Sequence, residues 1–291
     1  MTVRALAAGA FALAAGVASF ADGQAKPLPR VVSTTLCGDQ YIMALADRSQ
    51  IVSLSEQAAG PVSMHAREAK SLPHGRIDVE RLLDEHADLI LIEPGSRIKY
   101  AAAMQEVGLH TLMLPGAMVS SFDEIDDGVR RVAAALGHPD RGEALIAHMH
   151  ARIARLKRAQ PAPDKRPVAL YLVPGNGGAA KGTYVNLALE LAGFRNQQAL
   201  QGQKGWARNG LEQIVAHPPQ IFITSFFDTQ SDSLQASAGI HPLLGRLNAP
   251  VESIPGKYWI CASPTIIDAA EMMAAARIRD FPWSRVEADA Q

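Results

Sequence analysis

The chain has 291 residues, which is enough for one large domain or for two lobes of ordinary size. Hydrophobic residues make up 48% of the chain and charged residues 20%, a balance typical of globular proteins. The formal net charge is −1, so no broad basic field exists to collect phosphate groups, and we expect no nucleic-acid partner.

The first 25 residues have the pattern of a secretory signal peptide. Arg4 precedes an uncharged, alanine-rich run from Ala5 to Ala21, and small residues continue to Ala25. A membrane anchor is the alternative, but the run is shorter than the roughly 20 strongly apolar residues that a span requires. The first cysteine, Cys37, is too distant for a lipid-attachment site. We therefore predict that residues 1–25 are cleaved and that the mature protein is exported to the periplasm.

The first half of the mature chain alternates short apolar runs with helical patterns. The run Leu89-Ile-Leu-Ile92 is almost wholly apolar, as in a strand that is covered on both faces. Gly137 is suited to end the last helix of this half. The patterns predict strands at 30–34, 51–54, 89–92 and 111–114. They predict helices at 39–45, 79–86 and 122–136, and a further helix that follows Pro94-Gly95 and ends at Met104.

A helix of about six turns is predicted from Asp140 to Gln160, and Pro161 and Pro163 end it. Its apolar side chains lie on one face, which favours a helix packed along a core. After Pro163 the alternation of strands and helices begins again. The patterns predict strands at 168–173, 221–224 and 251–254, and helices at 185–191, 211–217 and 265–278.

This order predicts an α/β fold with parallel sheets and right-handed crossovers. We expect two Rossmann-like lobes joined by a single long helix, with a ligand cleft between them, because open sheets of this kind bind ligands beyond the carboxyl ends of their strands. The predicted parts are a signal peptide at 1–25, an N-terminal lobe at 28–138, an inter-lobe helix at 139–163 and a C-terminal lobe at 164–285. The alternative is one continuous doubly wound domain, and the new start after Pro163 favours two lobes.

Both halves contain one ordered pattern, in which a glutamate opens a short helix and a polar turn leads to a buried strand. Glu80 opens the helix before Leu89–Ile92, and Glu212 opens the helix before Ile221–Thr224. With the opening run Arg30-Val-Val-Ser-Thr-Thr-Leu-Cys37-Gly-Asp-Gln and the closing Ala262-Ser-Pro, this set resembles the periplasmic substrate-binding proteins of ABC importers for cobalamin, iron siderophores and haem. The resemblance extends over nearly the whole mature chain.

The resemblance implies a capture protein that binds its ligand between two lobes and does no chemistry on it, without a cofactor or resident metal. It implies that Glu80 and Glu212 dock on arginines of a membrane permease, which works with an ATPase at the inner membrane. A carboxylate in the first helical turn is favoured by the helix dipole and can accept a bidentate arginine. The alternative role for either glutamate is helix stability alone. We expect the free protein to be a monomer.

Loops that leave the strand ends are expected to line the cleft, among them residues 35–38, 55–58, 94–99 and 256–262. Aromatic faces suit a large flat macrocycle, and arginines suit the carboxylates or phosphate of a chelate. Trp206 is the strongest candidate, because its neighbours are polar and do not indicate a core position. The candidate ligand-binding residues are Cys37, His74, Arg76, Arg97, Trp206, Tyr258, Trp259 and Cys261.

The two cysteines, Cys37 and Cys261, are expected near strand ends that face the cleft, one in each lobe. Three states stay open for them: a disulfide across the cleft, a thiolate pair for a soft metal, and two unrelated buried thiols. A disulfide requires Cα atoms within about 7 Å and would restrict the motion of the lobes.

The ligand itself is left open by the sequence. A cobalamin-like corrinoid is the first expectation, followed by a ferric siderophore and by haem. His74 stands where we expect tryptophan in the cobalamin binders, and Tyr258 is suited to ligate haem iron. An exported enzyme acting on a metal chelate and a sensor subunit that delivers its ligand to a signalling protein are the alternatives from other classes.

Other motifs were tested against their structural context. Gly175-Asn-Gly-Gly-Ala-Ala180 matches a dinucleotide-binding pattern, but Lys181 and Gly182 interrupt the helix that this motif requires. We expect these glycines to let a loop approach a bulky ligand. The nine histidines form no metal-binding motif, and no G-x-S-x-G elbow of a hydrolase is present. The sequence therefore favours a binding protein over an enzyme.

Overall fold

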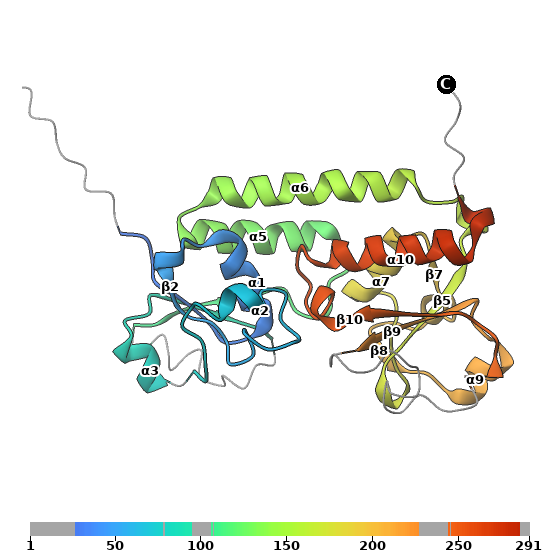
Figure 1. Cartoon of the computed structure of the whole chain (residues 1–291), viewed down its shortest axis with the longest axis horizontal. Coiled ribbons are helices and arrows are strands. Elements are labelled where there is room, and N and C mark those ends of the chain that lie inside the picture. The colour runs from blue at the N-terminus through green and yellow to red at the C-terminus, as the bar shows by residue number, and fades with distance from the viewer. Residues whose placement is uncertain are drawn as a thin grey trace, which may run out of the picture.

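The computed structural model describes residues 27–77, 79–94, 106, 108–226, 244 and 246–285. Two parallel sheets lie side by side, and the long helix α6 extends along both of them (Figure 1). The predicted α/β fold with two lobes is confirmed. The predicted signal peptide lies outside the described residues.

The sheet of the N-terminal lobe is parallel throughout, with the strand order β2-β1-β3-β4. Its side chains alternate between two hydrophobic clusters, so that Val31 and Leu91 pack on one face and Val32 and Ile90 on the other. This burial of both faces explains the nearly continuous apolar runs in the sequence. The strands are β1 (Val31–Ser33), β2 (Ile51–Ser53), β3 (Leu89–Ile92) and β4 (His110–Met113).

Helices cover both faces of this sheet. Ile42 and Val129 bring two helices onto the face of Val31, and Leu82 brings a third onto the opposite face. The helices are α1 (Leu36–Leu45), α2 (Ala66–Ala69), α3 (Val79–Asp84) and α5 (Phe122–Leu136). The last begins at a capping serine, Ser121, and ends at Gly137, whose φ of 81° lies in the left-handed region that glycine adopts readily.

The main sheet of the C-terminal lobe is also parallel, with the order β10-β9-β5-β7. One face packs on α7 and α10 through Tyr171 and Ile223, and the other packs on α9 through Leu170 and Phe222. The strands are β5 (Val168–Leu172), β7 (Arg195–Asn196), β9 (Ile221–Phe226) and β10 (Val251–Pro255), and the helices are α7 (Tyr184–Leu191), α8 (Gln197–Leu200), α9 (Leu211–Ala216) and α10 (Ile266–Asp280).

A small antiparallel sheet in this lobe was not predicted. It pairs β6 (Gly177–Ala179) with β8 (Trp206–Arg208). A Cβ atom on Gly178 would collide with the side chains of Gln198 and Asn209. Glycine is therefore required at position 178 by close packing inside the lobe. Residues 177–179 of the expected loop form a strand, whereas Gly175 lies in the turn that precedes it.

Helix α6 (Pro139–Arg158) connects the two hydrophobic cores. Ile146 packs in the core of the N-terminal lobe, whereas Met149 and Ile153 pack in the core of the C-terminal lobe. A single rigid helix that contributes to both cores limits how the lobes can move relative to each other. It is the inter-lobe helix that the sequence predicted, and the predicted bounds of the lobes remain a proposal.

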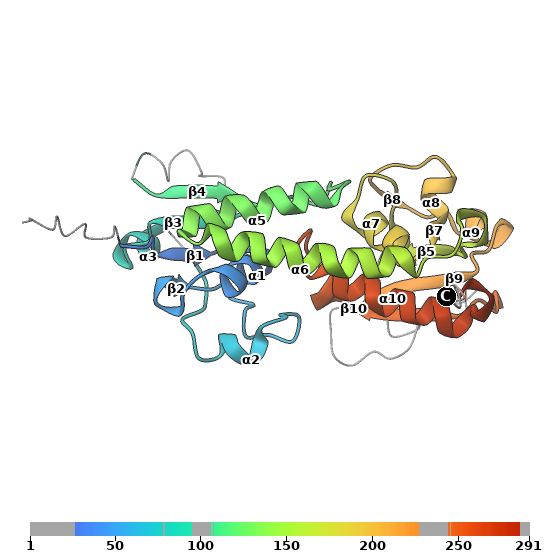
Figure 2. The ribbon, with the colours of Figure 1, turned by 90° about the horizontal axis from the view of Figure 1, so that it is seen from above.

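Helix α5 accompanies α6 between the lobes (Figure 2). Val129 belongs to the N-terminal core, but Ile125 near the start of the same helix is fully buried in the C-terminal core together with Val119. The segment before α5 therefore reaches the second lobe before the chain returns to the first. The connection between the lobes is broader than one helix.

Candidate ligand-binding site

A cavity of about 350 Å³ lies where the carboxyl ends of β1, β2 and β3 meet the other lobe. Parallel strands end at one edge of their sheet, so the loops that follow them converge there. Loops that the sequence analysis expected at 35–38, 55–58 and 256–262 all contribute to it. The lining residues are Thr34, Thr35, Leu36, Cys37, Ser55, Glu56, Gln57, Glu93 and Ile260.

The first loop of the cavity is held by hydrogen bonds around the start of α1. Thr35 caps the helix by accepting a hydrogen bond of 3.3 Å from the backbone N–H of Gly38. Asp39 is 1% exposed and accepts hydrogen bonds from Ser55, of 2.9 Å from its N–H and 2.6 Å from its hydroxyl. Burial raises the pKa of Asp39, and the hydrogen bonds from Ser55 oppose that rise. Asp39 therefore joins two cavity loops.

Helix α1 also contacts the segment of the C-terminal lobe that precedes α10. The Tyr41 hydroxyl donates a hydrogen bond of 3.3 Å to the carbonyl of Ala262. Gln40 donates from its amide to the carbonyl of Lys257 at 3.4 Å and accepts from the hydroxyls of Ser263 and Thr265. These bonds hold the two lobes together at the cavity.

Cys37 and Cys261 form a disulfide between the lobes, with a Cα–Cα distance of 5.5 Å. Cys37 is the second residue of α1, and Cys261 follows the short turn after β10. Of the three states that the sequence left open, the structure shows the disulfide. Cys37 lines the cavity, and Cys261 follows the lining residue Ile260.

Glu93 directly follows β3 and completes a cluster with the disulfide. A carboxylate oxygen of Glu93 and the sulfurs of Cys37 and Cys261 all lie within 4.8 Å of one another. Burial raises the pKa of Glu93, and a hydrogen bond with Thr35 acts in the opposite direction. Glu93 was not among the predicted site residues, although its place directly after a buried strand was a usable signal.

The predicted aromatic residues have different environments. Trp206 is 43% exposed, stacks edge-on against Tyr184 at a centroid distance of 5.6 Å, and donates to the Ala117 carbonyl at 3.4 Å. Trp259 is only 2% exposed, because it packs edge-on against Tyr171 and donates to the Ser225 hydroxyl. Neither ring lines the 350 Å³ cavity: Trp206 is exposed beside the segment before α5, whereas Trp259 belongs to the core, and contact of either with a ligand stays a prediction.

Tyr258 and the predicted polar candidates are less enclosed. Tyr258 is half-buried, and the Lys257 ammonium lies 5.2 Å from the centre of its ring. His74 and Arg76 are exposed, and the backbone of His74 pairs with Leu54 just beyond β2. None of these three lines the 350 Å³ cavity, and their contact with a ligand stays a prediction. Arg97 lies outside the described residues.

The two predicted docking residues are exposed in the first turns of their helices. Glu80 lies in α3 and Glu212 in α9. These helices lie near opposite ends of the molecule, and both are on the side that faces away from α6 (Figure 1). The geometry is therefore compatible with contact between both glutamates and one flat partner.

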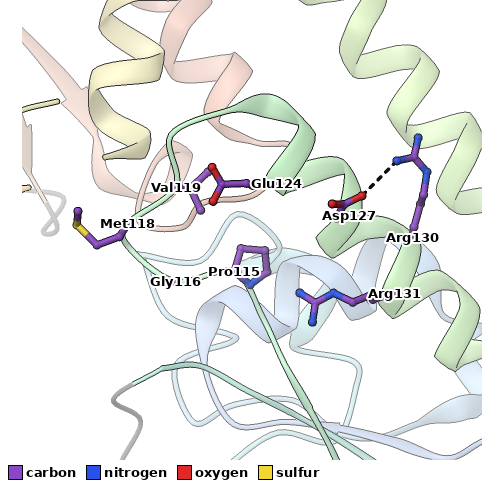
Figure 3. A pocket seen from close by; sticks show the side chains of 8 residues that line it. All are labelled: Pro115, Gly116, Met118, Val119, Glu124, Asp127, Arg130 and Arg131. Carbon is purple, nitrogen blue, oxygen red and sulfur yellow. Dashed lines mark ion pairs between the residues drawn. The ribbon is translucent and has the colours of Figure 1, made fainter. Parts of the chain in front are cut away.

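A second cavity, of about 460 Å³, lies beside α5 and the segment that leads into it (Figure 3). Arg130 forms ion pairs there with Asp127 at 3.5 Å and with Glu143 of α6 at 2.8 Å. Arg130 and Asp127, two of the charged residues that line this cavity, are thus paired within the protein. Its lining residues are Pro115, Gly116, Met118, Val119, Glu124, Asp127, Arg130 and Arg131. None of them was a predicted site residue, and all of them come from one continuous segment, part of which packs in the core of the C-terminal lobe.

Several solved structures share this fold. The periplasmic vitamin B12 binding protein of Vibrio cholerae is 18% identical, with a TM-score of 0.64 over 87% of this chain and 98% of that chain. The periplasmic heme binding protein of the same organism is 16% identical, with a TM-score of 0.70 over 85% and 98%. An Fe³⁺-hydroxamate transport protein of Saccharomonospora viridis is 17% identical, with a TM-score of 0.65 over 88% and 93%.

No curated protein matches the chain. Among the described residues, no helix has both the length and the apolarity needed to cross a membrane. The profile of the family described as "Periplasmic binding protein" matches residues 31–244, which include the N-terminal sheet, α6 and the strands β5, β7 and β9 of the C-terminal sheet. The chain therefore belongs to the periplasmic binding protein family.

Proposed function

We propose that this protein is the periplasmic capture component of an ABC importer and that it holds a metal chelate, a cobalamin-like corrinoid first of all, between its two lobes. It delivers the chelate unchanged to a membrane permease and its ATPase. It is exported, and residues 1–25 are its signal peptide. A ferric siderophore and haem are the next ligands to test.

The cavity at the lobe boundary is the observation that carries this proposal. Its walls come from three strand ends of one lobe and from Ile260 of the other, so a ligand placed there contacts both lobes. A ligand that bridges two lobes stabilises one relative position of them, and this position is what a partner can recognise. Among the described lining residues, neither the sequence nor the geometry indicates a catalytic pair of nucleophile and base. Reversible binding therefore accounts for the site without catalysis.

The chemical class of the ligand is supported by two observations. Structures of the same fold come from proteins named for vitamin B12, haem and Fe³⁺-hydroxamate, all of which are metal chelates. The exposed ring of Trp206 offers an aromatic face of the kind that packs on such ligands. A volume of 350 Å³ is near the lower end of the range of about 300–1,000 Å³ for ligand pockets, so a corrinoid would extend beyond it.

Docking on a permease is supported by the two helix starts. Both Glu80 and Glu212 are exposed, and their helices share one side of the molecule (Figure 1). Exposed carboxylates at helix N-termini are well placed to accept arginine side chains of a partner. Their separation across both lobes would let one partner sense the position of each lobe.

The test is titration of the purified mature protein with cyanocobalamin, haemin and ferrichrome, read by tryptophan fluorescence. We expect one of the three to quench the signal saturably at one molecule per chain and to be recovered unchanged. The variant W206F identifies how much of the signal comes from Trp206. Failure of all three to bind would contradict the proposed ligand class, and conversion of a bound compound would favour the exported enzyme instead.

A further inference from the structure

The two cysteines and Glu93 bring three metal-binding side chains to one wall of the cleft. Their ligand atoms lie within 4.8 Å of one another, and they come from the start of α1, the end of β3 and the segment before α10. Two of these segments belong to one lobe and the third to the other. The cluster therefore depends on the lobes being held together, as they are here by α1 and the residues around Cys261.

The chemistry of this donor set is that of a site for a thiophilic metal ion. Zn²⁺ and similar ions bind cysteine thiolates together with carboxylates, and three protein ligands leave one position open. Cys37 lies in the first turn of the ten-residue helix α1, where the helix dipole favours a thiolate over a thiol. Glu93 and Cys37 both line the cavity, so the open position would face the space where a ligand enters.

We propose that the reduced protein binds one thiophilic metal ion through Cys37, Cys261 and Glu93, and that the disulfide is the metal-free state of this site. A dithiol reductant reduces the Cys37–Cys261 disulfide by thiol–disulfide exchange. One thiolate attacks the disulfide, the Sγ–Sγ bond breaks, and the second thiol of the reductant closes its own disulfide. Two electrons and two protons thus pass to Cys37 and Cys261, and the incoming metal ion displaces the two protons.

The remaining contacts between the lobes should keep the reduced site assembled. Gln40 and Tyr41 bond to the segment 257–265 without any contribution from the disulfide. Helix α6 packs in both cores, and so does α5. Only a small separation of the two sulfurs is then needed to admit an ion between them. This site is independent of the chelate that the protein captures, because it uses the metal ion alone.

The test is binding of Co²⁺ to the folded protein after anaerobic reduction and removal of the reductant, with Zn²⁺ as competitor. We expect one Co²⁺ per chain, with the near-ultraviolet charge-transfer band of cobalt–thiolate bonds and the visible bands of tetrahedral cobalt. The oxidised protein should show neither band. The variants C37S and C261S should each lose affinity by more than about tenfold and lose charge-transfer intensity.

Glu93 is tested separately from the thiols. E93Q should weaken Co²⁺ binding by about tenfold or more while it keeps the charge-transfer band, because both thiolates remain. D84N is the control, since Asp84 is an exposed carboxylate of α3 that belongs neither to the cavity lining nor to the cluster, and its affinity should equal that of the wild type. Near-ultraviolet circular dichroism verifies the fold of every reduced sample.

Three results would overturn the proposal. The first is reduced, folded wild-type protein that shows no cobalt–thiolate band. The second is equal affinity in wild type and both cysteine variants, which would indicate a site elsewhere. The third is loss of the folded signal on reduction alone, because the cluster requires docked lobes. None of these results depends on whether the protein binds cyanocobalamin or another chelate.

Discussion

Gln40 of the N-terminal lobe accepts a hydrogen bond of 2.5 Å from the hydroxyl of Ser263 in the C-terminal lobe. Both residues are buried, and 223 positions of the chain separate them. The contact lies close to the disulfide, which also joins α1 to the segment before α10. The two lobes are therefore joined at the cleft itself as well as along α6.

Removal of the disulfide should destabilise the protein without preventing folding. The disulfide closes a loop of 224 residues, and such cross-links reduce the conformational freedom of the unfolded chain. We expect the double variant C37A/C261A to lose about 2–4 kcal/mol of unfolding free energy. Urea unfolding followed by circular dichroism measures it, with reduced wild type as the comparison. Equal stability of the variant and the oxidised wild type would show that the disulfide contributes nothing.

The ion pairs of Arg152 should stabilise the attachment of α6 to α10. Its guanidinium contacts Asp268 at 2.5 Å and Glu271 at 2.7 Å, and its side chain is only 15% exposed. We expect R152M to lower the free energy of unfolding by about 1–3 kcal/mol, since it leaves Asp268 without its arginine and Glu271 with only the exposed Arg155. R155M is the control, because Arg155 is 62% exposed and should change stability by less than about 0.5 kcal/mol.

The ion pair between Arg152 and Glu271 predicts that the stability of the protein depends on pH. The hydrogen bond from Arg152 lowers the pKa of Glu271 below its usual value of about 4.3. A lowered pKa in the folded state means that the stabilisation is complete above this value and is lost as the pH falls through the folded pKa. The difference in stability between wild type and R152M should therefore shrink from neutral pH to pH about 3. A constant difference would argue against an ionic origin.

The proposed docking residues should matter for uptake and not for ligand binding. Glu80 and Glu212 are exposed and do not line the cavity, so E80A/E212A should keep the affinity of the wild type. Uptake of the ligand by cells that depend on this protein should be lost. D84A is the matched control, because Asp84 is an exposed carboxylate at the other end of α3. Normal uptake by the double variant would count against docking through these glutamates.

Trp206 should contribute to ligand affinity, and Trp283 should not. Both rings are exposed, at 43% and 56%, but Trp283 lies beyond α10 and packs on Phe281. We expect W206A to weaken binding of the captured chelate by more than about tenfold, or 1.4 kcal/mol, and W283A to leave it unchanged. Isothermal titration calorimetry measures both variants without relying on fluorescence. Equal losses in the two variants would point to a general effect on the fold.

The local sequence pattern determined many of the strands and helices of this protein. The strands at Leu89–Ile92 and Ile221–Phe226 were predictable because both of their faces are buried, which requires an unbroken apolar run. The ends of α5 were predictable from Ser121 and Gly137, since capping depends on neighbours in the chain. The cleft loops followed from these elements, because the carboxyl ends of parallel strands share one edge of a sheet.

Other features were decided only by tertiary structure, because they depend on contacts between distant segments. Strand β6 is rich in glycine and shows no strand pattern in the sequence, yet it pairs with β8. Close packing against Gln198 and Asn209 explains the glycine at position 178. The burial of Trp259 depends on Tyr171 and Ser225, which its own neighbourhood in the sequence does not reveal. The sequence left three states possible for Cys37 and Cys261, because the distance between two cysteines far apart in the chain is set only when both lobes are docked. The tertiary structure decides for the disulfide.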